Sequence, residues 1–499
     1  MRHPIAPLFF AFGLLTPAIS LAQQPAPEPA PAPEAAPAPT PEPAAPPAAE
    51  PQAAPPAPAS AAPTPPPPAA PEPPPPPKPG AAPEPSPVKT KWGATLYGWL
   101  QADGIYDTTQ SFTEGSGGGI IQAKGSYGGE NGRTTYSFRN SRFGFRLNAP
   151  EVAGIKASGL VEVDFGGNQP PGITETQFWS NAAMRARHVW IKAETEYVDL
   201  LFGQTWNLFG WQPFFHPVTV ELQGVPGQAF SRTQTFRFSH TFKTEPVNID
   251  VAVAAARPPQ RDAAQPDLQG GLKLGVNGWK GQHGGGAGAA SSADPLSIGV
   301  SGIARKFAVP AFAGGTTDPV KKTGWGVSID ALLPVIPASS LDSIGALSLQ
   351  GSFQTGSGFN DQYTGLTGGI TAPLTMAAAA ATPPGAAVAI DPGLLVYDAG
   401  GNVHTIDWNI FLVDLTYFFP GGNVYVAANY SQMKSGNITD YGAPLPSVFT
   451  KEQWWDANIF WNVTPAFRIG AEYANFKQTM GDDSERKNSR FQFSGFYMF

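Results

Sequence analysis

The residues best suited to binding chemistry are basic side chains on segments where polar and apolar residues alternate. Alternation places four of them on a common polar face, namely Arg142, Arg146, Lys156 and Arg237. Guanidinium groups contact carboxylates and phosphates through paired hydrogen bonds, so this face favours small anions. The alternative is a structural network with the carboxylates Glu162, Asp164 and Glu221. Both roles can hold together, because a basic wall set against acidic groups creates a transverse field.

Two further arginines do not fit this pattern. Arg185 and Arg187 share parity with Val189 and Ile191, which places them on an apolar face. They lie outside the apolar band, in a contact between subunits of a trimer, or on a strand whose parity is assigned wrongly. Their role is left open.

A segment rich in aromatic residues separates two of the alternating stretches. Residues 207–228 include Trp211, Phe214 and Phe215 but a single carboxylate, Glu221. Because aromatic side chains exposed to water are costly, we expect the segment to be buried in a lumen or an interface. We predict that it forms the constriction of a channel; an exposed loop or a contact between subunits is the alternative.

Catalytic chemistry is not indicated by the remaining polar residues. The chain has no cysteine, which excludes disulfides and thiolate metal sites. His216 and Glu221 alone do not make a zinc site, and the glycines at 284–286 lack the strand-to-helix context of a phosphate-binding loop. No histidine accompanies a nucleophile motif. We expect no enzyme activity, no metal and no cofactor.

The N-terminal part has the composition of a targeting peptide followed by a chain that cannot fold alone. Arg2, an apolar run over residues 5–15 and a small-x-small site at residues 20–22 predict a signal peptide of residues 1–22. Residues 23–90 contain 30 of the 56 prolines. Such a segment favours extended polyproline II, with a contour of roughly 200 Å at about 3.1 Å per residue. We predict a disordered, periplasm-spanning extension, either a passive spacer or a tether.

Residues 91–499 consist of segments of about ten residues with a period of two. A soluble β-sandwich shows the same alternation, so further features must decide. Short connections alternate with long ones, and the last strand ends in Phe499, the usual terminal signal for the outer-membrane assembly machinery. Aromatic residues also sit at segment ends, as in interfacial girdles: Trp92, Trp99, Trp190, Trp206, Trp325, Trp408, Trp454, Trp455, Trp461, Tyr417 and Tyr497.

These features together predict an all-β fold, a transmembrane antiparallel β-barrel of about 16 strands with an inward-folded third loop. A barrel of this size encloses an aqueous channel. After loss of Arg2 the exported chain has 30 basic and 38 acidic residues, a net charge of −8. Nothing in that charge indicates a nucleic-acid partner.

The barrel resembles the DcaP-like trimeric outer-membrane porins, within the sixteen-stranded porin class. The motifs that carry the resemblance are SRFGF (141–145), VEVDF (161–165), FGQTW (202–206), PVTVE (217–221), GVPG (224–227), PDL (266–268), ANIFW (457–461), GAEY (470–473) and FQFS (491–494). The resemblance implies a homotrimer whose third loop folds into each pore, with small, often anionic, metabolites as cargo. That family typically has a coiled-coil segment before the barrel, where this chain has its Pro-rich segment. A trimer here would therefore rest on the barrel walls.

The expected function is that of an outer-membrane porin for passive diffusion of small hydrophilic, anionic solutes. Its expected partners are two further copies, outer-membrane lipid and the assembly machinery, with peptidoglycan as a candidate for residues 23–90. The alternative is a structural outer-membrane anchor whose Pro-rich tail tethers the membrane to the cell wall. Deletion of residues 23–90 separates the two hypotheses.

Overall fold

The computed structural model describes residues 92–499 with several gaps. The gaps are residues 117–118, 168–182, 222–223, 259–264, 310, 312–317, 339–344, 364–387, 392–393, 399–400 and 442–447. The predicted signal peptide and Pro-rich segment, residues 1–90, lie outside the described residues. In the part that is described, no helix has the length and hydropathy needed to cross a bilayer.

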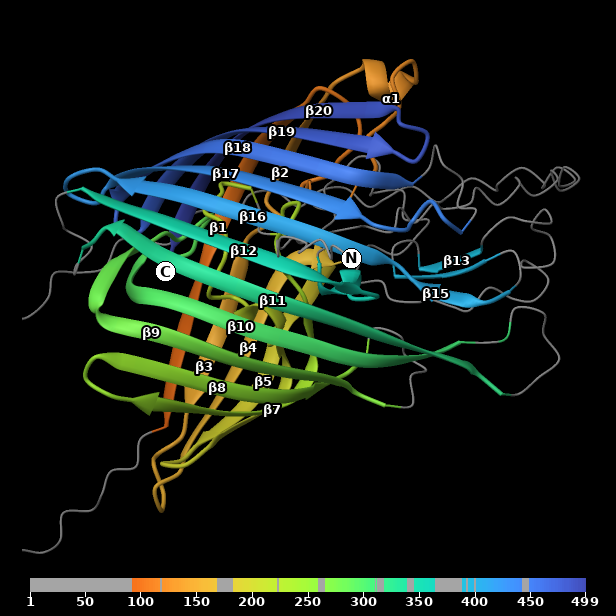
Figure 1. The fold of residues 1–499 in the computed structure, drawn as a ribbon. Helices are drawn as coiled ribbons and strands as arrows, with labels where there is room; N and C mark the ends of the chain where they lie inside the picture. The colour runs from red at the N-terminus through yellow and green to blue at the C-terminus, as the bar shows by residue number, and fades with distance from the viewer. Residues whose placement is uncertain are drawn as a thin grey trace, which may run out of the picture. The chain divides into compact units, whose positions relative to one another are not determined.

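The described residues form one antiparallel sheet of 17 strands that closes on itself (Figure 1). Its strands are β1 (Gly93–Asp107), β2 (Arg133–Ser137), β3 (Arg142–Asn148), β4 (Lys156–Gly167), β5 (Ala183–Glu194), β6 (Asp199–Trp206), β7 (Arg232–Lys243), β8 (Val247–Ala256), β9 (Asp267–His283), β10 (Ser292–Val309), β11 (Val320–Ile336), β12 (Ala346–Ser357), β16 (Asp407–Phe418), β17 (Val424–Ser435), β18 (Phe449–Thr464), β19 (Phe467–Met480) and β20 (Glu485–Met498). Strands β2 and β3 both pair with β1, so they fill one wall position. The described wall therefore has sixteen positions, which confirms the predicted barrel.

Smaller elements lie in the connections. Strands β13 (Val388–Asp391), β14 (Leu395–Tyr397) and β15 (Val403–Thr405) make a separate small sheet. The short helical elements are α1 (Tyr127–Glu130), η1 (Phe209–Trp211) and η2 (Asn360–Gln362). Closure of the barrel rests on β1 and β20, which pair from Trp99↔Met498 to Asp107↔Arg490.

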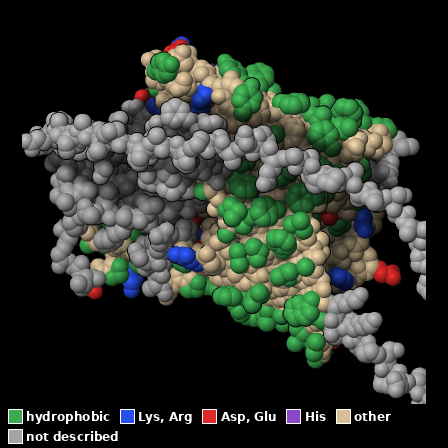
Figure 2. Space-filling model, turned by 180° about the vertical axis from the view of Figure 1, so that it is seen from behind, with side chains coloured by type: hydrophobic (Ala, Val, Ile, Leu, Met, Phe, Trp, Pro, Cys, Tyr) green, Lys and Arg blue, Asp and Glu red, His purple; other side chains and the backbone are tan. Residues whose placement is uncertain are grey.

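Alternation along each strand separates an apolar outer wall from a polar interior. On β20, Phe491 and Phe493 are exposed on the outside while Arg490 and Gln492 are buried inside. Figure 2 shows hydrophobic side chains spread over one outer face of the wall. A sheet with one apolar face and one polar face suits a wall between lipid and an aqueous lumen, because closure pairs the backbone groups of every strand.

The two ends of the barrel differ in the length of their connections. At one end, short turns join neighbouring strands at residues 195–198, 244–246 and 465–466. At the other end, residues 108–132 and 358–406 make long connections. We call these the short-turn end and the loop end. This asymmetry is typical of outer-membrane barrels, whose periplasmic turns are short.

The girdle interpretation is wrong for four tryptophans, because Trp99, Trp206, Trp408 and Trp454 are buried inside the barrel. The segment that folds into the lumen gives their indole rings packing partners that an empty channel lacks. By contrast, Trp92, Trp325, Trp455 and Trp461 are exposed on the outer wall.

Candidate functional site

The connection between β6 and β7, residues 207–231, folds into the lumen as its aromatic composition predicted, and is called the third loop. Its first turn, η1, is held by polar side chains of β9 and β10. Gln269 Oε1 accepts the N–H groups of Leu208 (2.8 Å) and Phe209 (3.0 Å), and Ser301 Oγ accepts the N–H of Gly210 (2.7 Å). Gly210 has φ 76°, a left-handed conformation that glycine adopts without strain. These bonds hold the loop across the β9–β10 side of the lumen.

The second half of the third loop runs along the opposite wall. The N–H of Val218 donates to Asp414 Oδ2 (3.1 Å), and the N–H of Val220 donates to Asn458 Oδ1 (2.9 Å). Glu472 Oε2 accepts from the Thr219 hydroxyl and from the N–H of Glu221, both at 2.7 Å. The acidic residues of this wall are buried beneath the loop and bind its backbone.

Glu221, the carboxylate predicted to lie at the constriction, is fully buried in an anchor. It lies 3.3 Å from Arg490 Nη1, whose guanidinium also holds Asp107 at 2.8 Å. The N–H of Ser116 donates a further hydrogen bond to Glu221. Burial raises the pKa of Glu221, and the Arg490 charge opposes that rise. The Glu221 side chain therefore lies between the third loop and the barrel wall, and not at the surface of the lumen.

Strands β3, β4, β5 and β7 carry a group that we call the basic cluster: Arg142, Arg185, Arg187, Arg232, Glu162 and Asp164. Arg187 binds Glu162 at 2.7 Å and Asp164 at 2.9 Å. Arg185 binds Asp164 at 2.7 Å, and Arg142 lies 3.6 Å from Glu162. Four arginines against two carboxylates leave a formal charge of +2. Arg232 stacks over Trp206 at 4.7 Å.

A β-bulge explains why strand parity left Arg185 and Arg187 unassigned. The pairing of β4 with β5 shifts between Glu162↔His188 and Val163↔Ala186, so Arg187 is an extra residue. As a result Arg187 and its neighbour His188 are both buried inside the barrel. Sequence reasoning missed Arg185, Arg187 and Arg232 as members of the basic cluster. The available signal was the acidic pair on β4, since two inward carboxylates require counter-charges.

The other predicted basic residues lie apart from the cluster. Arg146 is exposed, with its guanidinium 4.9 Å from the ring of Tyr97 near the short-turn end. Arg237 donates to the carbonyl oxygen of Trp206. Lys156 lies at the rim, largely exposed, 3.7 Å from Glu151. The structure thus does not bring Lys156 to the constriction, because it stands at the first position of β4.

The predicted aromatic residues lie on the β9–β10 side. The indole of Trp211 donates to the carbonyl oxygen of Val300 at 3.2 Å. Lys273 Nζ lies 4.0 Å from the centre of the Phe214 ring, and the Phe214 and Phe215 rings meet edge to face at 4.7 Å. Phe215 is buried. These rings fill the lumen beside the third loop.

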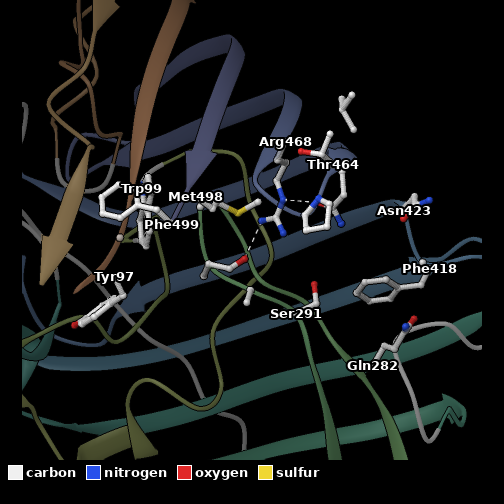
Figure 3. Close-up of a pocket in the computed structure, with 18 of the residues that line it drawn as sticks. Tyr97, Trp99, Gln282, Ser291, Phe418, Asn423, Thr464, Arg468, Met498 and Phe499 are labelled. Carbon is white, nitrogen blue, oxygen red and sulfur yellow. Dashed lines mark hydrogen bonds between the residues drawn. The ribbon is translucent and has the colours of Figure 1, made fainter. Parts of the chain in front are cut away.

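Two cavities among the described residues adjoin the third loop or the short-turn end. The inner cavity, about 440 Å³, lies between the basic cluster and the third loop, and its lining includes Arg142, Trp206, Phe214, His216 and His283. The mouth cavity, about 740 Å³, opens at the short-turn end (Figure 3). Within the described residues no group of three or more His, Cys, Asp or Glu side chains has the arrangement of a metal site.

No protein-family model and no curated protein match this chain. Among solved structures, the outer membrane channel DcaP of Acinetobacter baumannii is similar, with a TM-score of 0.59 and 19% identity over 82% of this chain and 97% of that chain. The anion-selective porin from Comamonas acidovorans has a TM-score of 0.45 and 10% identity over 82% of this chain and 100% of that chain. The likeness to DcaP confirms the expected fold, a closed antiparallel β-barrel.

Proposed function

We propose that this chain, which has the fold of the outer-membrane channel DcaP, is a passive diffusion channel selective for small hydrophilic anions. One observation carries the proposal: the third loop binds the buried carboxylates Asp414 and Glu472, whereas Arg142 of the basic cluster lines the inner cavity. The channel runs from the loop end to the mouth cavity at the short-turn end, which we place in the periplasm.

The charges that a solute meets follow from this arrangement. Asp414 and Glu472 are buried and bind backbone and hydroxyl groups of the third loop. Arg142, by contrast, lines the inner cavity as a member of the basic cluster, whose formal charge is +2, and Asp294 lines the same cavity. In a narrow aqueous passage between low-dielectric walls, such a charge raises the local concentration of anions and lowers that of cations.

The predicted site residues divide into proposed roles on this basis. We propose that Arg142 acts at the inner cavity, while Arg146 attracts anions at the mouth cavity that it lines. Arg237 stabilises the end of β6 through the Trp206 carbonyl. Trp211, Phe214 and Phe215 narrow the passage on the β9–β10 side.

The C-terminal Phe499 occupies the seam of the barrel. Its N–H donates to the carbonyl oxygen of Gly98 at 3.0 Å, and the N–H of Gly98 donates to its carbonyl oxygen at 2.9 Å. We propose that this residue completes closure after recognition by the assembly machinery. Removal of Phe499 would then lower the yield of folded barrel in membranes, while an assembly signal elsewhere would leave the yield unchanged.

The test is single-channel recording of the purified protein in a planar bilayer, with the reversal potential taken across a KCl gradient. We expect stepwise conductance and a reversal potential of the sign set by chloride. Three equal sub-levels would indicate the homotrimer that the resemblance implies. A preference for potassium would support a channel but refute the role of the basic cluster. An absence of conductance would refute the channel function.

The tether hypothesis is tested in the same system. Deletion of residues 23–90, which lie outside the described residues, leaves the conductance of a diffusion channel unchanged. A structural anchor would instead lose envelope integrity in cells on the same deletion, with its conductance irrelevant to the phenotype.

A further inference from the structure

The connection between β9 and β10, residues 284–291, departs from the other turns of the short-turn end, and we call it the inward turn. Its residues Gly285, Gly286, Ala287 and Gly288 are buried, although a turn at the end of a barrel is ordinarily exposed to water. The turn therefore enters the lumen from the side opposite to the third loop.

The inward turn meets the third loop directly. The N–H of Ala287 donates to the carbonyl oxygen of Thr219 at 2.9 Å. A Cβ at Gly284 would lie 2.5 Å from Val218 Cγ2, and a Cβ at Gly286 would lie 2.9 Å from the Thr219 oxygen. Contacts this close leave no room for a side chain, so the glycines allow the two segments to touch.

On its far side the inward turn reaches β1. A Cβ at Gly288 would lie 2.3 Å from Trp99 Cγ. The turn thus spans the lumen from β9 and β10 to the wall at β1. The inner cavity and the mouth cavity lie on its two sides, and Ala289 and Ala290 line both of them.

Arg468 on β19 holds the turn in this position. Its Nη1 donates to the carbonyl oxygens of Gly285 (3.1 Å), Ala287 (2.7 Å) and Ala289 (2.8 Å). Its Nε donates to Asn462 Oδ1 at 2.7 Å, which fixes the guanidinium from behind. Figure 3 shows Arg468 projecting into the mouth cavity between Met498 and Thr464.

A second wall residue supports the same carbonyl group. The hydroxyl of Tyr425 donates to the oxygen of Gly285 at 2.9 Å. Hydrogen bonds from a charged donor are stronger than neutral ones, so the arginine is the main fastening and the tyrosine is secondary. Without Arg468, the carbonyl oxygens of Gly285, Ala287 and Ala289 would lose their charged donor. The turn would then be more stable in water, where these oxygens can accept hydrogen bonds.

We propose that the inward turn is a second constriction of the channel and that Arg468 is the positioning residue that sets the size limit for solutes. The inference rests on the proposed channel function and adds an element to it. The third loop and the basic cluster determine which charge passes, while the inward turn determines how large a solute reaches the mouth cavity.

The first test compares wild type with Arg468→Gln and Tyr425→Phe. Single-channel conductance and the swelling rate of liposomes in sugars of increasing size are measured, with folding monitored by resistance to SDS at room temperature. We expect Arg468→Gln to raise the conductance about twofold and to admit larger sugars. Tyr425→Phe is expected to have a small effect of the same sign. An unchanged size limit in a folded Arg468→Gln protein would overturn the proposal.

A second test does not depend on how Arg468→Gln folds. The chain has no cysteine, so Ala290→Cys introduces a single thiol at an exposed residue of the inward turn that lines both cavities. A bulky thiol reagent should reduce the current of this variant in discrete steps. The matched control is Glu196→Cys, an exposed residue in the turn at residues 195–198 of the same end. Equal responses of the two variants would overturn the inference, whereas a wild-type protein without conductance would refute the channel itself.

Discussion

Substitution of Arg142 by glutamine isolates the contribution of one charge to ion selectivity. Arg142 lines the inner cavity and lies 3.6 Å from Glu162, whereas Arg187 holds the same carboxylate at 2.7 Å. The variant therefore keeps Glu162 paired and lowers the formal charge of the basic cluster from +2 to +1. Arg187 is a poorer choice, because its removal would leave both Glu162 and Asp164 without their shared partner.

The magnitude follows from Coulomb's law. An ion about 5 Å from the guanidinium in water interacts with it by about 0.8 kcal/mol. Screening at about 0.1 M salt, where the Debye length is about 10 Å, reduces this to about 0.5 kcal/mol. The guanidinium attracts an anion and repels a cation by the same free energy. Its removal therefore changes the free-energy difference between the two ions by about 1.0 to 1.6 kcal/mol, which is about 5- to 15-fold in the permeability ratio.

The assay is the reversal potential across a KCl gradient from about 0.1 M to about 0.01 M, where screening is weak. Arg142→Lys keeps the charge and should keep most of the selectivity. Lys434→Gln is the matched control, because it removes one positive charge from an exposed side chain on the outer face of β17. An Arg142→Gln channel with the wild-type permeability ratio, or an equal change in Lys434→Gln, would refute the assignment of the basic cluster.

Three further predictions concern the anchors and the wall, each measured by urea unfolding in lipid vesicles. Arg490→Met should lower the free energy of unfolding by about 3–5 kcal/mol, because Asp107 and Glu221 lose their buried partner; a loss below about 1 kcal/mol would contradict the anchor. Gln269→Leu should lower the free energy of unfolding by about 1–3 kcal/mol for each of the two third-loop N–H groups that lose their acceptor. It should also increase the noise of the single-channel current. A variant with wild-type stability and wild-type current noise would argue against this contact. Val253→Arg should cost about 2–4 kcal/mol on the outer wall, and no cost would mean that Val253 does not face lipid.

Much of the wall could be predicted from the sequence because a closed barrel obeys one local rule. Each strand separates lipid from water, so side chains of opposite character must alternate along it. Alternation along the last strand places Arg490, Gln492 and Ser494 on one face, and they are buried inside the barrel. The terminal pairing with β1 needs no further information, since closure requires it.

The rule fails where the backbone breaks its period or leaves the wall. One extra residue in β5 brings Arg187 and His188 to the same side, and the sequence carries no mark of the bulge. The glycines at 284–286 were assigned to an ordinary loop, yet they form the buried turn that meets the third loop. Such contacts join residues far apart in the chain, as in the bond between Ala287 and Thr219, and alternation carries no information about them.

Hydrogen bonding to the third loop accounts for the burial of several carboxylates inside the barrel. The third loop brings unpaired backbone N–H groups into the barrel, and each needs an acceptor. Asp414 and Glu472 meet that need for Val218, Thr219 and Glu221, which removes those carboxylates from the aqueous surface. Arginine lacks acceptor atoms and cannot satisfy an N–H group. Beneath the loop Arg490 binds carboxylates instead, while Arg142 lines the inner cavity. The proposed anion selectivity is therefore compatible with a chain of formal charge −7.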